Sequence, residues 1–278
     1  MDLGLAGKVA VVTGGAGVLG VEVARSLAAE GMNVALVDAD AERAEAAASA
    51  IAEAAASAIA EAGKGACRAF SCDATSREQV AATVDAVVGE WGGVHVLVNN
   101  VGASFADWLE DISESDAERC FAVNCATHLL MTQAVVPVMK RQGWGRILFI
   151  SSSSGLKGSA GLALYSASKY FVRGLGVATG LELARSGITA NVICPSDIVP
   201  DDGQPAGAWR VPKLVEISCE KEGVETFEEL VAARKRKNPT GRACQPADVA
   251  ALVCFLAGEQ AGFINAQTIG VNGGSLPT

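Results

Sequence analysis

Short apolar runs alternate with helical segments along almost the whole chain. The runs that predict buried strands cover residues 8–13, 33–37, 65–70, 95–98, 146–151, 188–193 and 267–271. Helical patterns lie between them, including residues 21–30, 41–62, 77–91 and 246–258. This alternation predicts an α/β fold over residues 1–278: a single-domain, Rossmann-type, doubly wound parallel sheet of about seven strands, with helices on both faces.

One segment, at about residues 199–241, interrupts the alternation. It combines Pro, Gly and Asp residues with two helical patterns, near 211–222 and 225–237. Connections of this length inside a compact domain are usually functional, and we interpret this one as a lid over the substrate. Its basic run at residues 234–237 (RKRK) is interpreted as a solvated helix end.

A tandem repeat marks the second predicted crossover. The eight residues EAAASAIA at 45–52 recur unchanged at 53–60. Because alanine and glutamate favour helix, we interpret the repeat as a tolerated duplication that lengthens a surface helix.

Composition and charge narrow the class of protein. The chain has 278 residues, and its formal net charge of −9 argues against nucleic acid as a partner. No uninterrupted apolar run approaches the roughly 18 residues that a membrane span needs. Eight cysteines without metal-type spacing, two isolated histidines and no N-terminal targeting segment predict a cytoplasmic protein with reduced thiols and no metal site.

A glycine-rich turn lies between the first predicted strand and the first helix. Gly15, Gly17 and Gly20 satisfy the spacing G-x-G-x-x-G in this strand-to-helix context. Glycines here let backbone N–H groups and a helix N-terminus approach a pyrophosphate. The residues expected to form this dinucleotide-binding turn are Gly14, Gly15, Gly17, Val18, Leu19 and Gly20.

The second predicted strand is followed directly by Asp38. Its distance from Gly20 is close to the roughly 20 residues expected for an acid that binds the adenosine ribose. The carboxylate would repel a 2′-phosphate, and residues 14–20 contain no Arg or Lys to attract one, so we expect NAD rather than NADP. The alternative is a structural glycine turn beside an Asp that merely ends a strand.

Polar residues also follow the third and fourth strands. Asp73, in the turn 71–75, is well placed to touch an adenine ring, although a helix N-cap is the competing interpretation for Asp73 and Thr75. Asn100, in the sequence 99–102 (NNVG), carries an amide that can stabilise strand ends and approach the cofactor ribose. By itself this second sequence is only a turn signal.

The main candidate for proton chemistry is a Tyr–Lys pair. Tyr165 and Lys169 stand four residues apart at the start of a helical pattern, so phenol and ammonium share one helix face. A free tyrosine has a pKa of about 10, and a nearby cation lowers it. The alternative is an ordinary exposed pair. Asn124, an amide within an apolar helical stretch, needs a partner if it is buried: a structural hydrogen bond, or water held by a kink.

Together these motifs resemble those of the short-chain dehydrogenase/reductase family, over essentially the whole chain. The matching pieces are Thr13 with the turn 14–20, Asp38, Cys72, Asp73, Ala74, Asn99, Asn100, Val101, Gly102, Asn124, Ser152, Tyr165, Lys169, Pro195, Ile198 and the Asn-Gly-Gly at 272–274. Ser152 is chosen among the serines at 151–154 because it precedes Tyr165 by the separation usual in the family. The resemblance adds Ala74, Val101, Gly102, Pro195, Ile198, Tyr165 and Lys169 to the expected cofactor-binding residues.

The resemblance also implies four catalytic residues. Tyr165 would be the general acid/base on the substrate oxygen, and Ser152 would hydrogen-bond that oxygen. Lys169 would bind the nicotinamide ribose and lower the tyrosine pKa. Asn124 would position a water that links Lys169 to solvent.

The implied function is NAD-dependent interconversion of a secondary alcohol, cyclic ones included, and its ketone by hydride transfer. Two alternatives are a non-catalytic NAD-sensing protein on the same fold and an NADPH-dependent ketoreductase. The candidate residues of the substrate pocket are Ser104, Phe105, Ser154, Lys157, Trp209 and Arg210. We interpret Lys157 and Arg210 as solvated loop cations; the alternative is that they bind an anionic group of the substrate. The family also implies a homotetramer.

Overall fold

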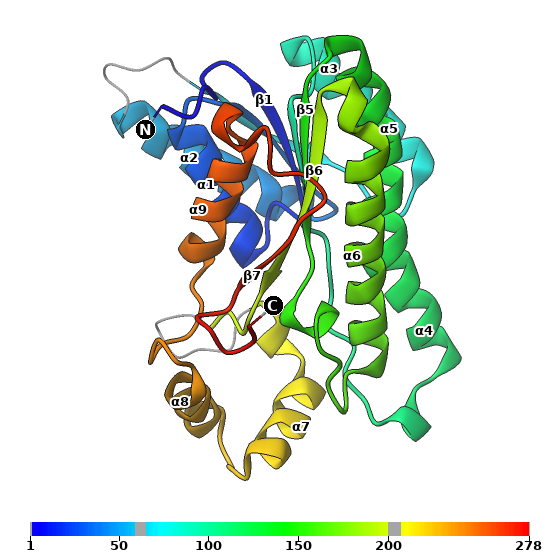
Figure 1. Ribbon diagram of the computed structural model, residues 1–278, viewed down its shortest axis with the longest axis vertical. Coiled ribbons are helices and arrows are strands. Elements are labelled where there is room, and N and C mark those ends of the chain that lie inside the picture. The colour runs from blue at the N-terminus through cyan, green and yellow to red at the C-terminus, as the bar shows by residue number, and fades with distance from the viewer. Residues whose placement is uncertain (1, 59–64, 200–206, 278) are drawn as a thin grey trace.

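A parallel sheet of seven strands runs through the middle of the protein (Figure 1). The structure, a computed structural model, describes residues 2–58, 65–199 and 207–277. The strands are β1 (Val9–Thr13), β2 (Asn33–Asp38), β3 (Cys67–Ser71), β4 (Val96–Asn99), β5 (Gly145–Ile150), β6 (Ile188–Pro195) and β7 (Thr268–Val271). Their order is β3-β2-β1-β4-β5-β6-β7, with every neighbouring pair parallel. The predicted Rossmann-type sheet is confirmed.

Helices cover both faces of the sheet. They are α1 (Val18–Ala29), α2 (Ala41–Ala58), α3 (Arg77–Trp91), α4 (Glu114–Phe121), α5 (Thr127–Gln142), α6 (Ala163–Leu183), α7 (Pro212–Glu222), α8 (Phe227–Lys237) and α9 (Pro246–Ala257). Helices α1, α2 and α9 lie on one face, and α3, α5 and α6 on the other (Figure 1). Each face has its own core, represented by Leu27 and Val253 on the first and by Val84 and Met131 on the second. Covering both faces explains why β1, β4, β5 and β6 are buried along their whole length.

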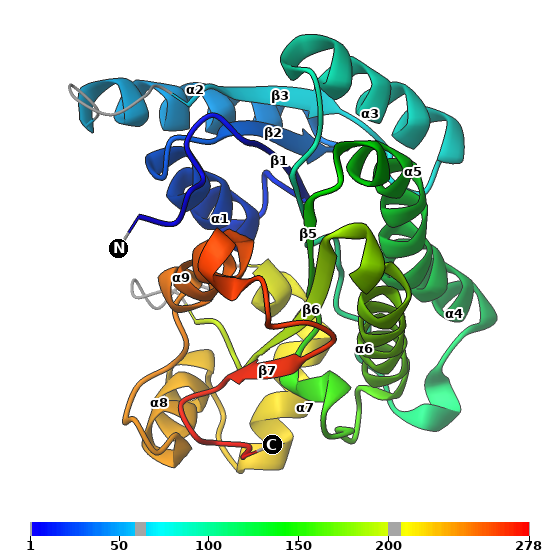
Figure 2. The same ribbon diagram turned by 45° about the horizontal axis from the view of Figure 1, so that its top comes forward.

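The strand order reverses between β1 and β4, which places a crevice at the carboxyl ends of the central strands. Helices α7 and α8 lie beyond these ends, away from the helices that cover the faces (Figures 1 and 2). In open parallel sheets, ligands bind in such a crevice. The topology therefore predicts a ligand site at the carboxyl ends of the central strands.

The segment predicted as a lid contains a small hydrophobic cluster of its own. Trp209, Leu214 and Leu230 are buried in it, and Ala106 and Leu162 from the rest of the protein pack against it. Both predicted helical pieces are found, as α7 and α8, whereas residues 200–206 of the segment lie outside the described residues. That the segment acts as a lid stays a prediction.

The tandem repeat lies in α2, which ends at Ala58. The last two residues of the second copy, 59 and 60, fall outside the part of the chain that the structure describes. The interpretation as a tolerated duplication stays a prediction.

Among the described residues, one helical run meets the length and hydropathy expected of a membrane span. It extends over Glu114–Gln142, with a mean hydropathy of 1.3 in its most apolar window. In that window 44% of the residues are buried inside the protein. Met131, Val135 and Met139 pack in the core between α5 and the sheet. Such burial is typical of a core helix, and a run of this kind is weak grounds for a span.

Helix α6 approaches the sheet closely at Gly176, and this predicts a position-specific effect on stability. A Cβ at Gly176 would clash with Val192 and come within 3.0 Å of the Phe149 ring. We expect Gly176→Ala to lower the free energy of unfolding by about 1–3 kcal/mol through overpacking. The same change at Gly174, which has open space around it, is expected to raise stability by about 0.5–1 kcal/mol. Urea unfolding measures both, and equal effects would contradict the prediction.

Candidate active site

A cavity of about 1320 Å³ opens at the carboxyl ends of the strands. Its lining includes most of the predicted site residues: Gly14, Gly17, Val18, Leu19, Asp38, Asp73, Ala74, Asn100, Val101, Gly102, Ser152, Tyr165, Lys169, Pro195 and Ile198. Gly15, Gly20 and Asn124 are the predicted residues that do not line it. The structure therefore brings residues from both halves of the chain to one crevice.

The glycine turn owes its shape to close backbone approaches. Gly14 has a φ of +61°, a conformation that favours glycine. A Cβ at Gly20 would clash with the Gly14 carbonyl oxygen, and one at Gly15 would clash with Leu36. Gly17, the N-cap of α1, has no side chain to cap the first helical turn. The turn is thus a glycine-lined cradle at a helix N-terminus, which fits a dinucleotide pyrophosphate.

Asp38 and Arg43 hold the turn from two sides. The Asp38 carboxylate accepts hydrogen bonds from the backbone N–H of Ala16 (3.0 Å) and of Asp40 (3.1 Å). The Arg43 guanidinium donates to the Ala16 carbonyl (2.9 Å). Both Asp38 and Arg43 line the cavity. Arg43 was not predicted from the sequence, because it lies in the first turn of α2 and not within the glycine turn at residues 14–20.

Asp73 and Asn100 form the next part of the lining. Asp73 accepts hydrogen bonds from the N–H (2.9 Å) and hydroxyl (2.7 Å) of Thr75, which lower the pKa of its carboxyl. Neither Asp73 nor Thr75 caps α3, because Ser76 does so; the N-cap interpretation is wrong. The Asn100 amide donates to the carbonyls of Thr13 and Gly14, both at 3.1 Å. The predicted stabilisation of the strand ends by this amide is confirmed.

Ser152, Tyr165 and Lys169 converge at the far side of the cavity. The Ser152 hydroxyl lies near the Tyr165 phenol and lowers its pKa. The Lys169 ammonium is buried, donates to the Ile150 carbonyl (3.1 Å) and lies 5.7 Å from the centre of the Tyr165 ring. It also lies against Gly102, where a Cβ would be 3.1 Å from Nζ. Ser152 follows β5, while Tyr165 and Lys169 lie on successive turns of α6, so the strand and the helix together position the three groups.

The pKa of Tyr165 departs from its ordinary value in the direction opposite to the one expected. Burial raises it, the Ser152 hydrogen bond lowers it, and the negative charge of Asp197 raises it further. Burial also lowers the pKa of Lys169 to about 8. That Lys169 lowers the tyrosine pKa stays a prediction, and burial is the largest influence on the phenol in this structure.

Asn124 lies behind the cavity in a widened π-helical turn, Ala122–Ala126. Its side chain is fully buried and exchanges hydrogen bonds with Ala103, accepting from the N–H (2.8 Å) and donating to the carbonyl (2.9 Å). It also donates to the Ser168 hydroxyl (3.0 Å), which in turn donates to the Tyr165 carbonyl (2.7 Å). Of the two possibilities left open by the sequence, a structural hydrogen bond is found, and it lies in a π-turn of the kind often seen at functional sites.

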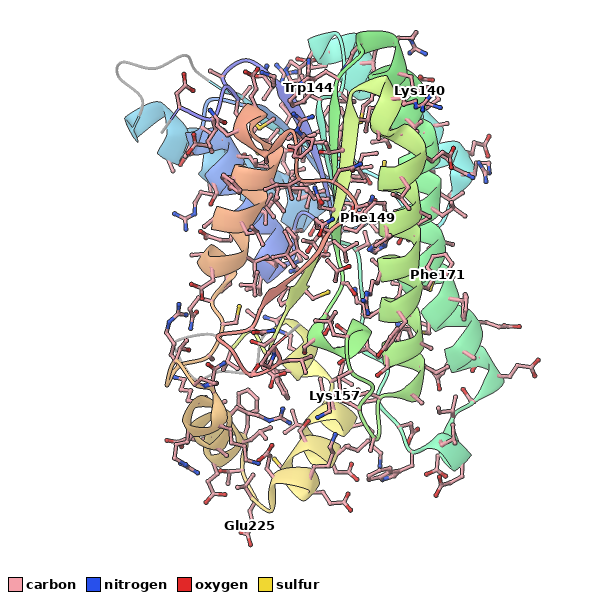
Figure 3. All side chains as sticks on the ribbon, in the orientation of Figure 1. Lys140, Trp144, Phe149, Lys157, Phe171 and Glu225 are labelled. Carbon is pink, nitrogen blue, oxygen red and sulfur yellow. The ribbon has the colours of Figure 1, made fainter. Side chains whose placement is uncertain are left out.

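The candidate substrate-pocket residues also face the cavity. These are Ser104, Phe105, Ser154, Lys157, Trp209 and Arg210. Lys157 projects from the end of the sheet toward α7 (Figure 3). The Trp209 indole donates to the Ile198 carbonyl (3.1 Å) and so joins the predicted lid to the end of β6.

Within residues 2–58, 65–199 and 207–277, no group of three or more His, Cys, Asp or Glu residues could hold a metal ion. The eight cysteines are free and buried. His95 accepts a hydrogen bond from the Val9 N–H (3.1 Å), a structural role as predicted.

Comparisons with known proteins agree with this architecture. Residues 8–210 match the family model described as short chain dehydrogenase, and residues 211–275 match one described as enoyl-(acyl carrier protein) reductase. A D-threitol dehydrogenase of Mycolicibacterium smegmatis is 32% identical over 98% of this chain and 94% of that protein. Among solved structures, NAD⁺-bound xylitol dehydrogenase has a TM-score of 0.87 at 28% identity, over 97% of this chain and 99% of the other. An actinorhodin polyketide ketoreductase variant with NADPH has a TM-score of 0.84 at 33% identity, and the match covers 96% of this chain and 97% of the other.

The chain therefore belongs to the short-chain dehydrogenase/reductase family. It is an oxidoreductase of secondary alcohols or their ketones, and the family uses a nicotinamide cofactor.

Proposed function

We propose that the protein is an NAD-dependent alcohol dehydrogenase/reductase that interconverts a secondary alcohol and its ketone, with Tyr165 as the general acid/base. The observation that supports this most strongly is the convergence of Ser152, Tyr165 and Lys169 on the cavity that the glycine turn also lines. When bound, the nicotinamide ring supplies the acceptor or donor of the hydride. The protein supplies orientation and proton transfer.

Each of the four catalytic residues has a distinct role in the proposal. The Ser152 hydroxyl holds the substrate oxygen beside the Tyr165 phenol, whose pKa it lowers. In oxidation Tyr165 accepts the alcohol proton, and in reduction it returns the proton to the carbonyl oxygen. Lys169 binds ribose hydroxyls and stabilises the phenolate. Asn124 holds the segment after β4 in place and positions a water behind Lys169.

For the cofactor we propose NAD, because the Asp38 carboxylate lines the cavity at the end of β2 and would repel a 2′-phosphate. The other proposed contacts come from the glycine turn, Asp73, Ala74, Asn100, Val101, Gly102, Pro195 and Ile198. Arg43 is the observation that favours the NADPH-dependent alternative, since its guanidinium lies beside the same turn. The ratio of activities with the two cofactors separates the alternatives.

The substrate class is proposed from the lining and from the relatives. Threitol and xylitol, which appear in the names of two similar enzymes, are polyols. The cavity combines hydroxyl groups of Ser104 and Ser154 with the apolar Phe105, which suits a medium-sized polyol or cyclic alcohol. A panel of such alcohols, scored by NADH absorbance, tests the proposal. An NAD-sensing protein would bind the dinucleotide and reduce it with none of them.

Cytoplasmic location and a homotetrameric state stay predictions. An exposed aromatic pair on α4 and α6, Phe121 and Phe171, supports assembly, with ring centres 6.3 Å apart. Phe171 projects from the side of α6 that faces away from the sheet, whereas Phe149 lies between α6 and the sheet (Figure 3). Leu181 and Phe263 are further exposed apolar residues, with relative solvent exposures of 71% and 102%. We expect a tetramer in sedimentation velocity; a monomer would contradict this prediction.

A further inference from the structure

Ion pairs join α7 and α8 to the end of β6. We call residues 212–237, which contain the two helices, the α7–α8 unit. Arg234 on α8 lies 2.9 Å from the Asp197 carboxylate after β6 and 3.2 Å from the Glu222 carboxylate at the end of α7. Lys237 is also paired with Glu222. The interpretation of residues 234–237 as a solvated helix end is confirmed for Lys237, whose side chain is 68% exposed in the last turn of α8. It is wrong for Arg234, because tertiary folding brings two carboxylates to its guanidinium.

The pairs differ in their exposure to solvent. The Glu222 side chain is 9% exposed, whereas those of Arg234, Asp197 and Lys237 are 29%, 38% and 68% exposed. Exposed ion pairs contribute little to stability, whereas removal of one partner from a buried pair leaves an uncompensated charge. Arg234 therefore bridges two carboxylates, Asp197 after β6 and Glu222 at the end of α7.

Asp197 connects this cluster to the proposed reaction centre. It lies in the cavity lining with Tyr165, and its negative charge is one of the causes that raise the tyrosine pKa. The other groups that influence the phenol are Ser152, Cys120 on α4 and Cys194 on β6, and the Lys169 ammonium lies 5.7 Å from the centre of its ring. Asp197 is thus the carboxylate that links this cluster to the phenol.

Further charges and thiols surround Asp197 and Arg234. Besides Glu222, they are Lys221 and Lys237 on the α7–α8 unit and Cys244 before α9. Lys221 donates to the Ala160 carbonyl (3.0 Å) in the loop before α6, so it provides a second link between α7 and the site.

We propose that Arg234 is a positioning residue that holds Asp197 and Glu222 together, and thereby couples docking of the α7–α8 unit to proton transfer at Tyr165. The inference rests on the proposed function, because it requires Tyr165 to be the acid/base. With the unit docked, the guanidinium offsets the Asp197 charge near the phenol. With the pair broken, that charge acts on the phenol in full and the phenolate is harder to form.

Substitution of Arg234 and substitution of Asp197 are expected to move the pH profile of alcohol oxidation in opposite directions. Alcohol oxidation requires the phenolate, so the rate rises as the pH rises through the tyrosine pKa. In Arg234→Gln the Asp197 charge is no longer offset, and the profile of kcat/KM against pH should move to higher pH by on the order of 0.5–1 unit. In Asp197→Asn the charge itself is absent, and the profile should move to lower pH. The double variant should follow Asp197→Asn, because Arg234 acts through Asp197.

The experiment measures pH profiles of alcohol oxidation with NAD and amide hydrogen exchange over residues 212–237 in the same variants. Arg236→Gln, at an exposed site two residues further on, is the matched control and should change neither measurement. Arg234→Lys should shift the pH profile less than Arg234→Gln does, because lysine keeps the positive charge. We expect faster exchange in the α7–α8 unit of Arg234→Gln.

Two results would overturn the inference. One is an unshifted pH profile in both Arg234→Gln and Asp197→Asn. The other is a shift in the same direction in both variants, which would indicate a general structural disturbance. Failure of the proposed function has a different signature, because Tyr165→Phe would then retain activity. Amide hydrogen exchange in Arg234→Gln would still show whether Arg234 docks the α7–α8 unit.

Discussion

Tyr165→Phe is expected to reduce kcat/KM for alcohol oxidation by about 10²–10⁴-fold, the range typical of general acid–base catalysis. The change removes one oxygen from a side chain that lines the cavity and leaves the ring in place. The glycine turn and Asp38 are untouched, so NAD binding should be retained. Steady-state kinetics and a dinucleotide-binding titration measure the two properties separately.

The chain offers a matched control for this experiment, because Tyr170 is its only other tyrosine. Tyr170 is 43% exposed, and its hydroxyl donates to the Leu156 carbonyl (2.8 Å) on the outside of α6. Tyr170→Phe should therefore leave kcat/KM almost unchanged. Equal losses of kcat/KM in the two variants would mean that Tyr165→Phe lowers activity by disturbing the fold and not by removing the acid/base. Full activity in Tyr165→Phe would remove it from the reaction.

Asp38→Ser is expected to change the cofactor preference. Loss of charged hydrogen bonds to ribose hydroxyls, worth about 1.5–3 kcal/mol, should lower kcat/KM with NAD by about 10–100-fold. Loss of the repulsion should raise the value with NADP, because Arg43 then offers the 2′-phosphate an attractive charge beside Ala16. Kinetics with both cofactors give the ratio.

Asp40→Asn is the control for this second prediction. Asp40 lies two residues further on, is exposed, and accepts a hydrogen bond from the Arg43 N–H (3.0 Å). Because an exposed charge has a small effect, the cofactor ratio should stay within about threefold of the unmodified protein. An unchanged ratio in Asp38→Ser would show that this carboxylate does not select the cofactor.

Much of the fold and of the site was predictable because the relevant signals are local. The apolar runs placed all seven strands within two residues of their observed ends. The glycine spacing at 14–20 and the four-residue spacing of Tyr165 and Lys169 are set by a single turn and a single helix. Such short-range patterns can be interpreted from the chain alone.

The functional residues that were missed are the ones that depend on pairing across long distances in the chain. Arg43 reaches the glycine turn because β1 and β2 are neighbours in the sheet. Arg234 reaches Asp197 because α8 folds back against the end of β6. A basic residue in a sequence carries no sign of which carboxylate it will meet.

The amino-acid order alone indicated the parallel α/β architecture through its periodicity, and it indicated the glycine turn and the Tyr165–Lys169 pair through their spacing. The role of Tyr165 as acid/base is what the family resemblance implies. Only the tertiary structure decided how acidic that phenol is. Burial raises the pKa of Tyr165, and Asp197, which lies 32 positions further along the chain and is held by Arg234, adds to the effect. The physical reason is that desolvation and charge–charge energies depend on distances in space, which the folded chain sets.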